Sequence, residues 1–274
     1  MNQKQNTRLF AYLTVILTVL LSICAVAALA LGVTSLVTKD PTPQETTKGT
    51  DDTPTLTTPT DVTLKEGEDA GMAYIDKMIF FGESTTAHLS SRGGLSNGAG
   101  QVWKDASGTK RLSSRLLSEN IVYPPTGESI TVTEAASFEK PEYMVLSFGL
   151  NGITDFIKDK SSYVNNYNKL IRAIQEASPD TKIILQSVYP VTTACDDWNE
   201  SGATISQYTR TLNEWLPEIA AMNQNVRYVD TASVLTDEDG CLDERYDYSG
   251  DGVHLTADAY VKIIAYLRTH PWQE

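Results

Sequence analysis

Residues 142–149 read EYMVLSFG, and residues 181–190 read TKIILQSVYP. Both are short and almost continuously apolar, which is typical of strands that are buried on both faces of a parallel sheet. Three further runs extend the pattern: KMIFFGE at residues 77–83, NVRYVD at residues 225–230 and, more weakly, NIVYPP at residues 120–125. The sequence therefore predicts a parallel sheet of about five strands.

Helical patterns lie between and after these runs. Residues 162–177 place apolar side chains at three- and four-residue steps, and residues 205–222 and 255–269 show similar patterns. Pro217 is expected to bend or interrupt the second of these helices. Strands that alternate with helices predict an α/β fold in three layers, with helices covering both faces of the sheet.

The N-terminal region predicts a membrane anchor. Residues 9–37 contain no charged residue and are long enough to span a bilayer. Lys4 and Arg8 precede this span, so we expect residues 1–8 in the cytoplasm and the rest of a single-pass cell-membrane protein outside the cell. The alternative is a signal peptide cleaved after small residues such as Ala25–Ala27, but the apolar run continues past them.

The segment after the anchor is rich in Thr, Pro and Asp. Residues 38–70 contain too little apolar surface to offset the entropy of ordering, so they predict a flexible linker before a folded domain at residues 71–274. Cys195 and Cys241 both lie in predicted loops of that domain. In an oxidising compartment they could pair or remain two free thiols, and the sequence leaves both alternatives open.

The overall charge argues against nucleic acid as a partner. The chain has 22 Lys and Arg residues against 35 Asp and Glu residues, a net charge of −13, and no basic cluster to neutralise phosphates. The sequence carries no signal for an oligomeric state.

Polar residues with catalytic potential follow two of the strands and precede the last helix. Ser84 comes directly after the first strand, in FFGESTT, and Asn151 lies between glycines in SFGLNGI. Asp251 and His254 lie three residues apart in SGDGVHLT. Each residue alone is better explained as a helix cap or a turn residue. Together they supply a nucleophile, a base, an acceptor that orients the base and an oxyanion donor.

These segments also resemble a known family. FFGEST, FGLNG and DGVH are similar to blocks I, III and V of the SGNH (GDSL-type) hydrolases, and the similarity runs from Tyr74 to the end of the chain. The resemblance implies a flavodoxin-like SGNH-hydrolase fold and a serine esterase that needs no cofactor. It implies Ser84 as the nucleophile, His254 as the base and Asp251 as the residue that orients His254.

The resemblance also implies an oxyanion hole. Its donors would be the backbone N–H of Ser84, the side-chain amide of Asn151 and the backbone N–H of a glycine after the second strand. We assign that glycine to Gly127 in PPTGES, with Gly94 in SRGGL as the competing choice.

Two positions depart from the family pattern beside these donors. Glu83 stands where the family usually has Asp, and Gly152 stands where block III usually ends in Asp. The loss of one oxyanion donor can cost about 3 kcal/mol of barrier, so the geometry here could tune or disable activity. Residues 90–117 are longer than a minimal member needs and could shape the substrate cleft.

Other site chemistries have weaker support. His88, four residues after Ser84, could assist or replace His254 if this segment is helical. Glu83 with the Asp196–Asp197 pair could suggest a glycosidase, but nothing fixes their separation. No metal site is expected, because the three histidines are scattered and no metal-ligating spacing occurs.

The sequence therefore predicts an extracytoplasmic serine esterase. The expected substrate is a small acyl ester, such as an acetyl ester, on a cell-envelope glycan or another carbohydrate. The alternatives are a binding module that kept the fold without turnover, and an O-acyltransferase that uses the same serine.

Overall fold

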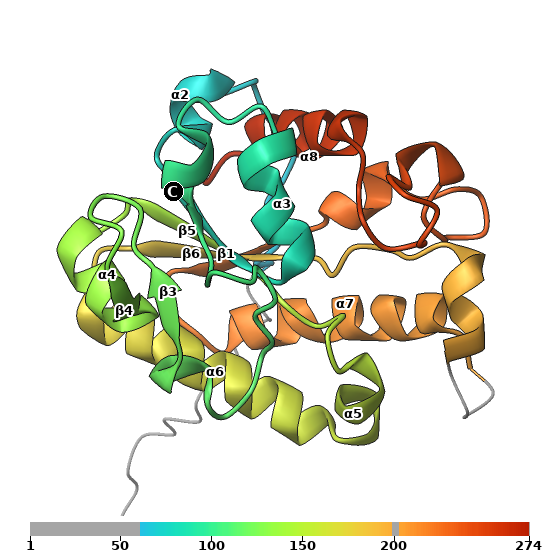
Figure 1. Ribbon diagram of the computed structural model, residues 1–274, viewed down its shortest axis with the longest axis horizontal. Coiled ribbons are helices and arrows are strands. Elements are labelled where there is room, and N and C mark those ends of the chain that lie inside the picture. Colours follow the sequence, from blue (N-terminus) through green and yellow to red (C-terminus); the bar gives the residue numbers. More distant parts are fainter. Residues whose placement is uncertain (1–60, 199–202, 274) are drawn as a thin grey trace, which may run out of the picture. The chain divides into compact units, whose positions relative to one another are not determined.

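The computed structural model describes residues 61–198 and 203–273. Its centre is a parallel sheet with the strand order β2-β1-β5-β6-β7 (Figure 1). The five strands are β1 (Met78–Gly82), β2 (Val102–Trp103), β5 (Tyr143–Ser147), β6 (Lys182–Gln186) and β7 (Val226–Val229). The order reverses direction between β1 and β5, as in doubly wound α/β folds, whose ligands bind at the carboxyl ends of the strands. The predicted parallel sheet is confirmed.

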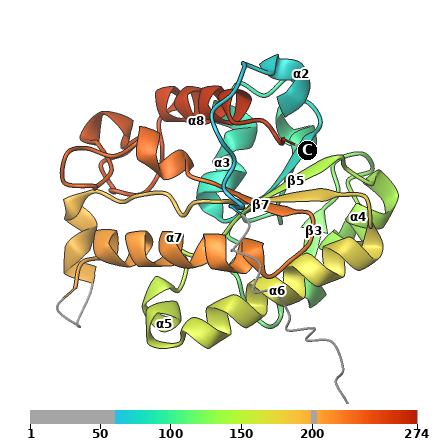
Figure 2. The ribbon, with the colours of Figure 1, turned by 180° about the vertical axis from the view of Figure 1, so that it is seen from behind.

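Helices cover both faces of this sheet, as Figures 1 and 2 show from opposite sides. One face carries α4 (Val132–Glu139), α5 (Ile153–Lys158), α6 (Lys160–Ala177) and α7 (Ile205–Ala221). The other carries α2 (Gly71–Ile75), α3 (Ser84–Arg92) and α8 (Ala257–Thr269). Short 3-10 turns are η1 (Gly98–Gln101), η2 (Leu116–Ser118), η3 (Thr193–Trp198), η4 (Thr231–Val234) and η5 (Glu244–Tyr246).

The strands divide their side chains between two apolar cores. Phe81, Leu146 and Leu185 are neighbours in register and point to the α6 and α7 side, whereas Phe80 and Val145 point to the α3 and α8 side. This alternation with a period of two explains why almost every strand residue is apolar. The fold is therefore a three-layer sandwich, as predicted.

The three long helices lie where the apolar periodicity predicts them, and side chains define their beginnings. Thr204 and Gln207 form a capping box at the start of α7, and Thr256 caps α8 by accepting from the N–H of Ala259. The expected interruption at Pro217 is wrong, because α7 continues through it to Ala221.

The weak strand candidate NIVYPP is not part of the central sheet. Residues Asn120–Val122 form β3, which pairs antiparallel with β4 (Ser129–Thr131) in a separate hairpin. Only the middle residue of β3, Ile121, is buried, so this strand suits a sheet that is covered on one face. The outermost strand of the central sheet is instead β2, which has two residues and lies within the segment 90–117.

Residues 61–70, which the composition assigns to the linker, pack against the domain. Val62 and Leu64 are buried, and this segment runs parallel to β7. Val62 accepts a hydrogen bond from the N–H of Tyr228 at 2.9 Å, and the N–H of Leu64 donates to Tyr228 at 2.8 Å. Two buried apolar side chains are enough to hold a segment that is otherwise polar. The folded part therefore includes residues before Gly71.

The predicted anchor at residues 9–37 lies outside the described residues, as do residues 38–60 of the linker. Within the ranges that the structure describes, none of the helices combines the length and apolar character needed to cross a bilayer. The two domain cysteines, Cys195 and Cys241, are both buried, and no disulfide joins them.

Candidate active site

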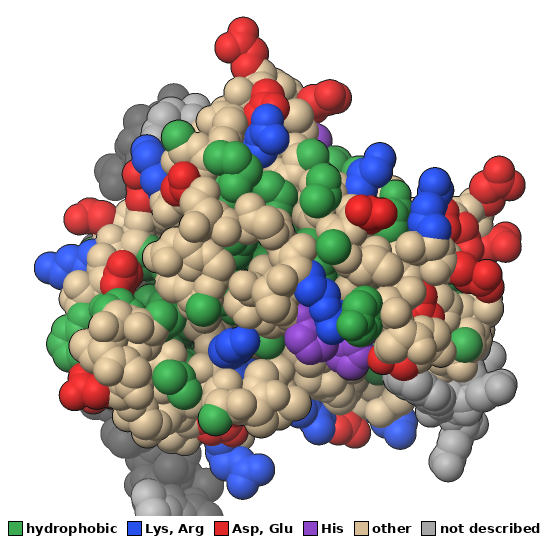
Figure 3. Space-filling view, turned by 45° about the horizontal axis from the view of Figure 1, so that its top comes forward, with side chains coloured by type: hydrophobic (Ala, Val, Ile, Leu, Met, Phe, Trp, Pro, Cys, Tyr) green, Lys and Arg blue, Asp and Glu red, His purple; other side chains and the backbone are tan. Residues whose placement is uncertain are grey.

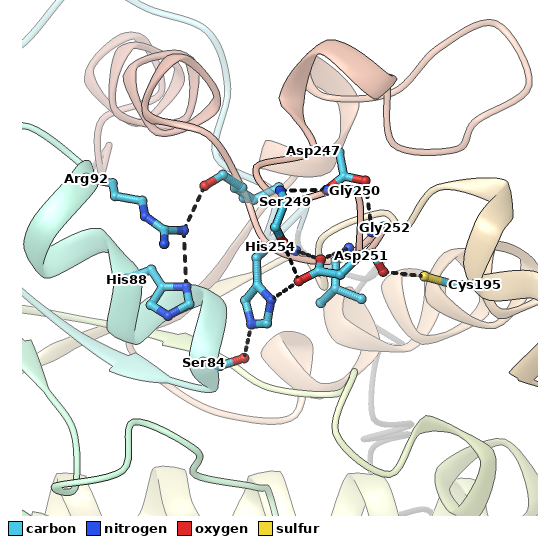
Figure 4. A network of polar contacts seen from close by, with 12 residues as sticks. Ser84, His88, Arg92, Cys195, Asp247, Ser249, Gly250, Asp251, Gly252 and His254 are labelled. Carbon is cyan, nitrogen blue, oxygen red and sulfur yellow. Dashed lines mark hydrogen bonds and ion pairs between the residues drawn. The ribbon is translucent and has the colours of Figure 1, made fainter.

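Ser84, His254 and Asp251 form a chain of hydrogen bonds at the carboxyl edge of the sheet (Figure 4). The Nε2 atom of His254 lies 3.2 Å from the hydroxyl oxygen of Ser84. The Nδ1 atom of the same imidazole lies 2.7 Å from Oδ2 of Asp251. The sequence places Ser84 and His254 170 residues apart, and the fold brings them into contact. This arrangement can pass a proton from the hydroxyl to the imidazole, with the carboxylate fixing the orientation of the ring.

Ser84 occupies the first turn of α3, directly after β1. Its position depends on Gly82, because a Cβ atom there would collide with the carbonyl oxygen of Ser147 on β5 and with the side chain of Thr86. As the first residue of the helix, Ser84 has a backbone N–H without an acceptor inside the helix. The hydroxyl of Tyr260 donates to the carbonyl of Thr85 at 2.5 Å, which ties α8 to the start of α3.

Residues 247–254, here called the acid–base loop, are stabilised by hydrogen bonds within the loop. The Oδ1 atom of Asp251 accepts from the backbone N–H groups of Val253 and His254, both at 2.9 Å. Its Oδ2 atom also accepts from the hydroxyl of Ser249 at 2.7 Å. Partial desolvation opposes ionisation of Asp251, but the bonds from His254, Ser249 and Val253 outweigh it and lower the pKa of the carboxyl. Asp251 therefore stays charged beside the imidazole.

A second carboxylate shapes the turn in this loop. Asp247 accepts from the N–H of Gly250 at 3.0 Å and from the N–H of Gly252 at 2.9 Å. Gly250 and Gly252 both have positive φ angles, of 73° and 77°, which only glycine adopts easily. Outside the loop, the N–H of Thr192 donates to the carbonyl of Gly252 at 2.9 Å and Cys195 lies 3.5 Å from the carbonyl of Asp251, so the loop is also fixed against the segment after β6.

Residues 148–152, here called the amide loop, carry Asn151 and follow β5. Glu83 is buried, and its carboxylate accepts hydrogen bonds of 3.0–3.1 Å from three successive backbone N–H groups, those of Gly149, Leu150 and Asn151. The side-chain amide of Asn151 donates to the carbonyl of Lys110 at 3.1 Å. An amide group has two N–H donors, so one remains for a ligand in the cleft.

The amide loop is also held from below by two tyrosines of α6. The hydroxyls of Tyr163 and Tyr167 donate to the carbonyl of Phe148 at 2.9 and 3.0 Å, and the N–H of Phe148 lies 3.0 Å from the Tyr167 oxygen. Both tyrosines are fully buried. The amide loop thus rests on the core, whereas the carboxylates that shape the acid–base loop belong to that loop itself.

Burial raises the pKa of Glu83 to about 7, against the opposing effect of the three backbone N–H groups and of Arg111. The extra methylene of Glu, compared with the usual Asp, still allows its two oxygens to accept from three successive N–H groups of the amide loop. The first departure from the family pattern is therefore accommodated by the structure.

The second departure, Gly152, makes room for an arginine. Gly152 has a φ angle of 90°, and a Cβ atom there would collide with the guanidinium of Arg111. Arg111 donates to Asp155 at 2.6 Å, one turn into α5. The segment after β2 is thereby fixed against the end of the amide loop. Neither departure displaces Asn151 from the site.

A cleft of about 370 Å³ opens beside Ser84. Asn151, Asp251 and His254 contribute its polar wall, and the remaining wall is aliphatic, formed by Leu150, Ile153, Ile205 and Val253. A narrow set of polar groups in an otherwise apolar cleft is typical of a small-molecule site.

The oxyanion role predicted for Gly127 is not supported and is corrected here. Gly127 lies at the turn between β3 and β4, outside the lining of the cleft, and its N–H donates to the carbonyl of Tyr123 at 2.7 Å. The competing Gly94 is exposed just after α3 and does not line the cleft either. The prediction for Gly127 depends on NIVYPP as the second strand of the central sheet, and this segment lies in a separate hairpin instead.

The loop that does follow the second sheet strand was missed. Residues 104–111 come after β2 and reach the site through the Lys110 carbonyl, and Gly108 lies against Ala87 of α3. The N–H of Gly108 donates to the side-chain carboxylate of Asp105 at 2.6 Å. A two-residue strand is too short to give a periodic signal, so the sequence pattern could not identify this loop.

His88 lies on α3, one turn after Ser84, but its partner is not the serine. Its Nδ1 atom lies 3.5 Å from Nη1 of Arg92, and its ring centre lies 4.8 Å from that of His254. The imidazole that contacts the Ser84 hydroxyl is that of His254, which favours the predicted base over its alternative.

Two alternatives from the sequence can be compared with the structure. Glu83 faces the backbone of the amide loop rather than the cleft, so it does not suit a glycosidase carboxylate; the side chains of Asp196 and Asp197 lie outside the described part. In that described part, no group of three or more His, Cys, Asp or Glu side chains is arranged to hold a metal ion.

The comparison with protein families gave one match. The model of the GDSL-like lipase/acylhydrolase family matches residues 80–262, about two thirds of the chain. The matched range includes Ser84, Asn151, Asp251 and His254. Among curated proteins, none matched this chain.

Solved structures with a similar fold include three bacterial proteins. A Streptococcus pneumonia protein provisionally assigned as a platelet activating factor has a TM-score of 0.50 and 19% identity, over 70% of this chain and 82% of that one. A provisionally assigned acylhydrolase from Bacteroides fragilis has a TM-score of 0.45 and 20% identity, over 70% and 84%. A family two carbohydrate esterase from Clostridium thermocellum has a TM-score of 0.45 and 15% identity, over 70% and 62%. At 19% identity, the likeness to the Streptococcus pneumonia protein concerns the fold alone.

Proposed function

Because this chain belongs to the GDSL-like lipase/acylhydrolase family, and is thus a hydrolase of ester bonds, we propose that Ser84, His254 and Asp251 carry out its reaction through an acyl-enzyme. The observation that carries this proposal is the continuous contact from the Ser84 hydroxyl through the imidazole to the Asp251 carboxylate. No cofactor takes part in this scheme.

In the first half of the reaction, the Ser84 oxygen attacks the ester carbonyl while His254 accepts the hydroxyl proton at Nε2. The negative charge on the carbonyl oxygen is stabilised by the N–H of Ser84 and the side-chain amide of Asn151. The bond to the alcohol then breaks, His254 returns its proton to the alcohol oxygen, and the alcohol leaves. The acyl group remains on Ser84.

In the second half, a water molecule takes the place of the alcohol. His254 accepts a proton from the water as its oxygen attacks the acyl carbon, and then returns a proton to the Ser84 oxygen as the acid departs. Asp251 keeps Nδ1 of the ring protonated and stabilises the imidazolium in both halves. If a sugar hydroxyl replaced the water, the same residues would perform an O-acyl transfer.

The substrate we propose is a small acyl ester, such as an acetyl ester, on a carbohydrate of the cell envelope. The aliphatic side of the cleft supports an apolar acyl group next to Ser84. The predicted anchor at residues 9–37 supports a location at the outer face of the cell membrane, where envelope glycans are within reach.

Two reagents test the proposed machinery. The full-length protein should hydrolyse 4-nitrophenyl acetate and should be labelled at Ser84 by a serine-reactive phosphonate, and Ser84→Ala should abolish both. A non-catalytic binding module would show neither turnover nor label. Product analysis with an added sugar acceptor separates a hydrolase, which yields free acetate, from a transferase, which yields acetylated sugar.

A further inference from the structure

His88 lies beside His254 on the side away from Asp251, and Arg92 contacts His88 (Figure 4). Lys104, whose charge acts on His88, and Tyr248, which packs against Arg92, complete this group. His88, Arg92, Lys104 and Tyr248 are here called the cationic rim. The guanidinium of Arg92 lies 3.6 Å from the centre of the Tyr248 ring, and its Nη1 atom lies 3.5 Å from His88. Tyr248 belongs to the acid–base loop and is 56% exposed. The rim therefore joins α3 to the loop that carries the base.

The two permanent charges of the rim have no acidic partner. Within the ranges that the structure describes, neither Arg92 nor Lys104 forms an ion pair with a carboxylate: Arg92 donates to the carbonyl of Leu255 and Lys104 to the hydroxyl of Ser90. By contrast, Lys110 and Arg111, a few residues further along the same segment, are both paired with acids.

The imidazole of His88 adds a neutral polar group between these charges. Burial lowers the pKa of His88, and the nearby Arg92, His254 and Lys104 lower it further. At neutral pH this ring is therefore uncharged and can donate or accept a hydrogen bond. Figure 3 shows histidine side chains at the surface of this face, next to Lys or Arg and hydrophobic side chains.

The reaction geometry indicates what the rim would contact. The alcohol oxygen of the ester must come within reach of Nε2 of His254, because that atom supplies its proton. The aliphatic cleft on the Asp251 side of the ring suits the acyl group. With the acyl group there, the alcohol part would extend past His254 towards His88, whose ring centre lies 4.8 Å from that of His254.

We propose that the cationic rim is a subsite for the alcohol part of the ester and that it selects alcohols with a negative charge, such as acidic sugars. This inference rests on the proposed function and specifies its substrate. Arg92 and Lys104 attract the anion, His88 bonds to a hydroxyl, and the exposed Tyr248 ring packs against the sugar. On a chain with a net charge of −13, a local cation pair is also what keeps an anionic substrate from being repelled.

The test compares three acetyl esters on the full-length protein by the acetate they release: acetylated glucose, acetylated glucuronic acid and acetylated glucose 6-phosphate. The wild type should have a higher kcat/KM for one or both anionic sugars than for the neutral one. The double variant Arg92→Gln/Lys104→Gln should lower that ratio about tenfold. The wild-type ratio should also fall as salt is raised. The carboxylate and phosphate arms identify which anion is preferred.

Lys262→Gln, on the exposed side of α8, is the matched control and should leave the ratio unchanged. A wild-type ratio at or below one, or a ratio that the double variant does not change, overturns the subsite even if 4-nitrophenyl acetate is hydrolysed. A protein that hydrolyses no ester and is not labelled at Ser84 refutes the proposed function instead. Inhibition of 4-nitrophenyl acetate hydrolysis by free glucuronate but not glucose gives a second measurement; equal inhibition by both sugars also overturns the subsite.

Discussion

The acid–base loop and the amide loop meet at Ser84 but are held there by different forces. The acid–base loop is largely exposed and is shaped by its own carboxylates, Asp247 and Asp251, which bond to N–H groups a few residues away. The amide loop is fixed by a buried carboxylate, Glu83, that lies 66 to 68 residues earlier in the chain. One loop therefore depends on local sequence, and the other depends on the core.

This difference separates catalysis from stability. In the acid–base loop, the side chains of His254 and Ser249 are partly or fully exposed, so replacing either should reduce turnover with little effect on folding. A change at Glu83 disturbs the core as well as the site, so it should affect both. Four measurements test this difference between the two loops.

The largest effect is expected for His254→Gln. Glutamine cannot accept the Ser84 proton, so kcat for 4-nitrophenyl acetate should fall about 10⁴-fold or more. The side chain of His254 is 30% exposed, so the free energy of unfolding should change by less than about 1 kcal/mol. His270→Gln, at the end of α8, is the control of the same residue type and should keep its activity. A His254→Gln enzyme with near-normal turnover would remove this residue from the mechanism.

Asn151→Ala should reduce kcat about 10²- to 10³-fold, because it removes one of the proposed oxyanion donors. KM should change much less, since the charge develops only in the transition state. Asn165→Ala, an exposed asparagine on α6, is the control and should be silent. If Asn151→Ala instead lowers the free energy of unfolding by as many kcal/mol as it raises the activation barrier, the main role of Asn151 is to hold the amide loop to the Lys110 carbonyl.

Glu83 should make the stability of the protein depend on pH. Its pKa is about 7 in the folded protein, compared with an ordinary 4.5, so between these values the unfolded chain has released a proton that the native carboxyl still holds. The unfolded state is then favoured as pH rises, and this group should lower the free energy of unfolding by up to about 3 kcal/mol between pH 4.5 and 7, with no further change above. Denaturant titrations at several pH values measure it.

The same titrations on Glu83→Gln provide the comparison. Glutamine does not ionise, so the decrease between pH 4.5 and 7 should be absent from that variant. A decrease that persists unchanged in Glu83→Gln would assign it to other groups and would remove the main contrast between the two loops.

The smallest effect is expected for Ser249→Ala. This change removes one hydrogen bond to Oδ2 of Asp251, but the carboxylate keeps its bonds to the imidazole and to two N–H groups. We expect a two- to threefold decrease in kcat, about 0.5 kcal/mol, and no change in the melting temperature. A decrease in kcat of more than about thirtyfold would mean that the remaining hydrogen bonds to Asp251 do not hold its carboxylate in place without Ser249.

The contrast also explains which parts of the site the sequence could predict. Asp251 and His254 could be assigned because the two residues contact each other within one short motif, DGVH, that resembles a block of the family. Ser84 and Asn151 could be assigned because each follows an apolar strand. The role of Glu83 as the support of the amide loop could not, since no local pattern connects it to N–H groups on a different strand end.

Errors in the fold have the same physical origin. The two residues of β2 give no periodicity, so the sequence predicts the second strand in the neighbouring hairpin and, with it, the role of Gly127. Residues 61–70 are polar in composition, and only their pairing with β7 shows that Val62 and Leu64 are buried. Local sequence patterns do not predict short segments whose stability comes from residues far away in the chain.

The pairing of Val62 and Leu64 with Tyr228 has a practical consequence for protein production. These residues cover the outer edge of β7, the last strand of the sheet. A truncated protein that starts at Gly71 would leave the N–H and C=O groups of Tyr228 open to strands from other molecules, and exposed sheet edges promote aggregation. Truncations intended for crystals or assays should therefore begin before Asp61.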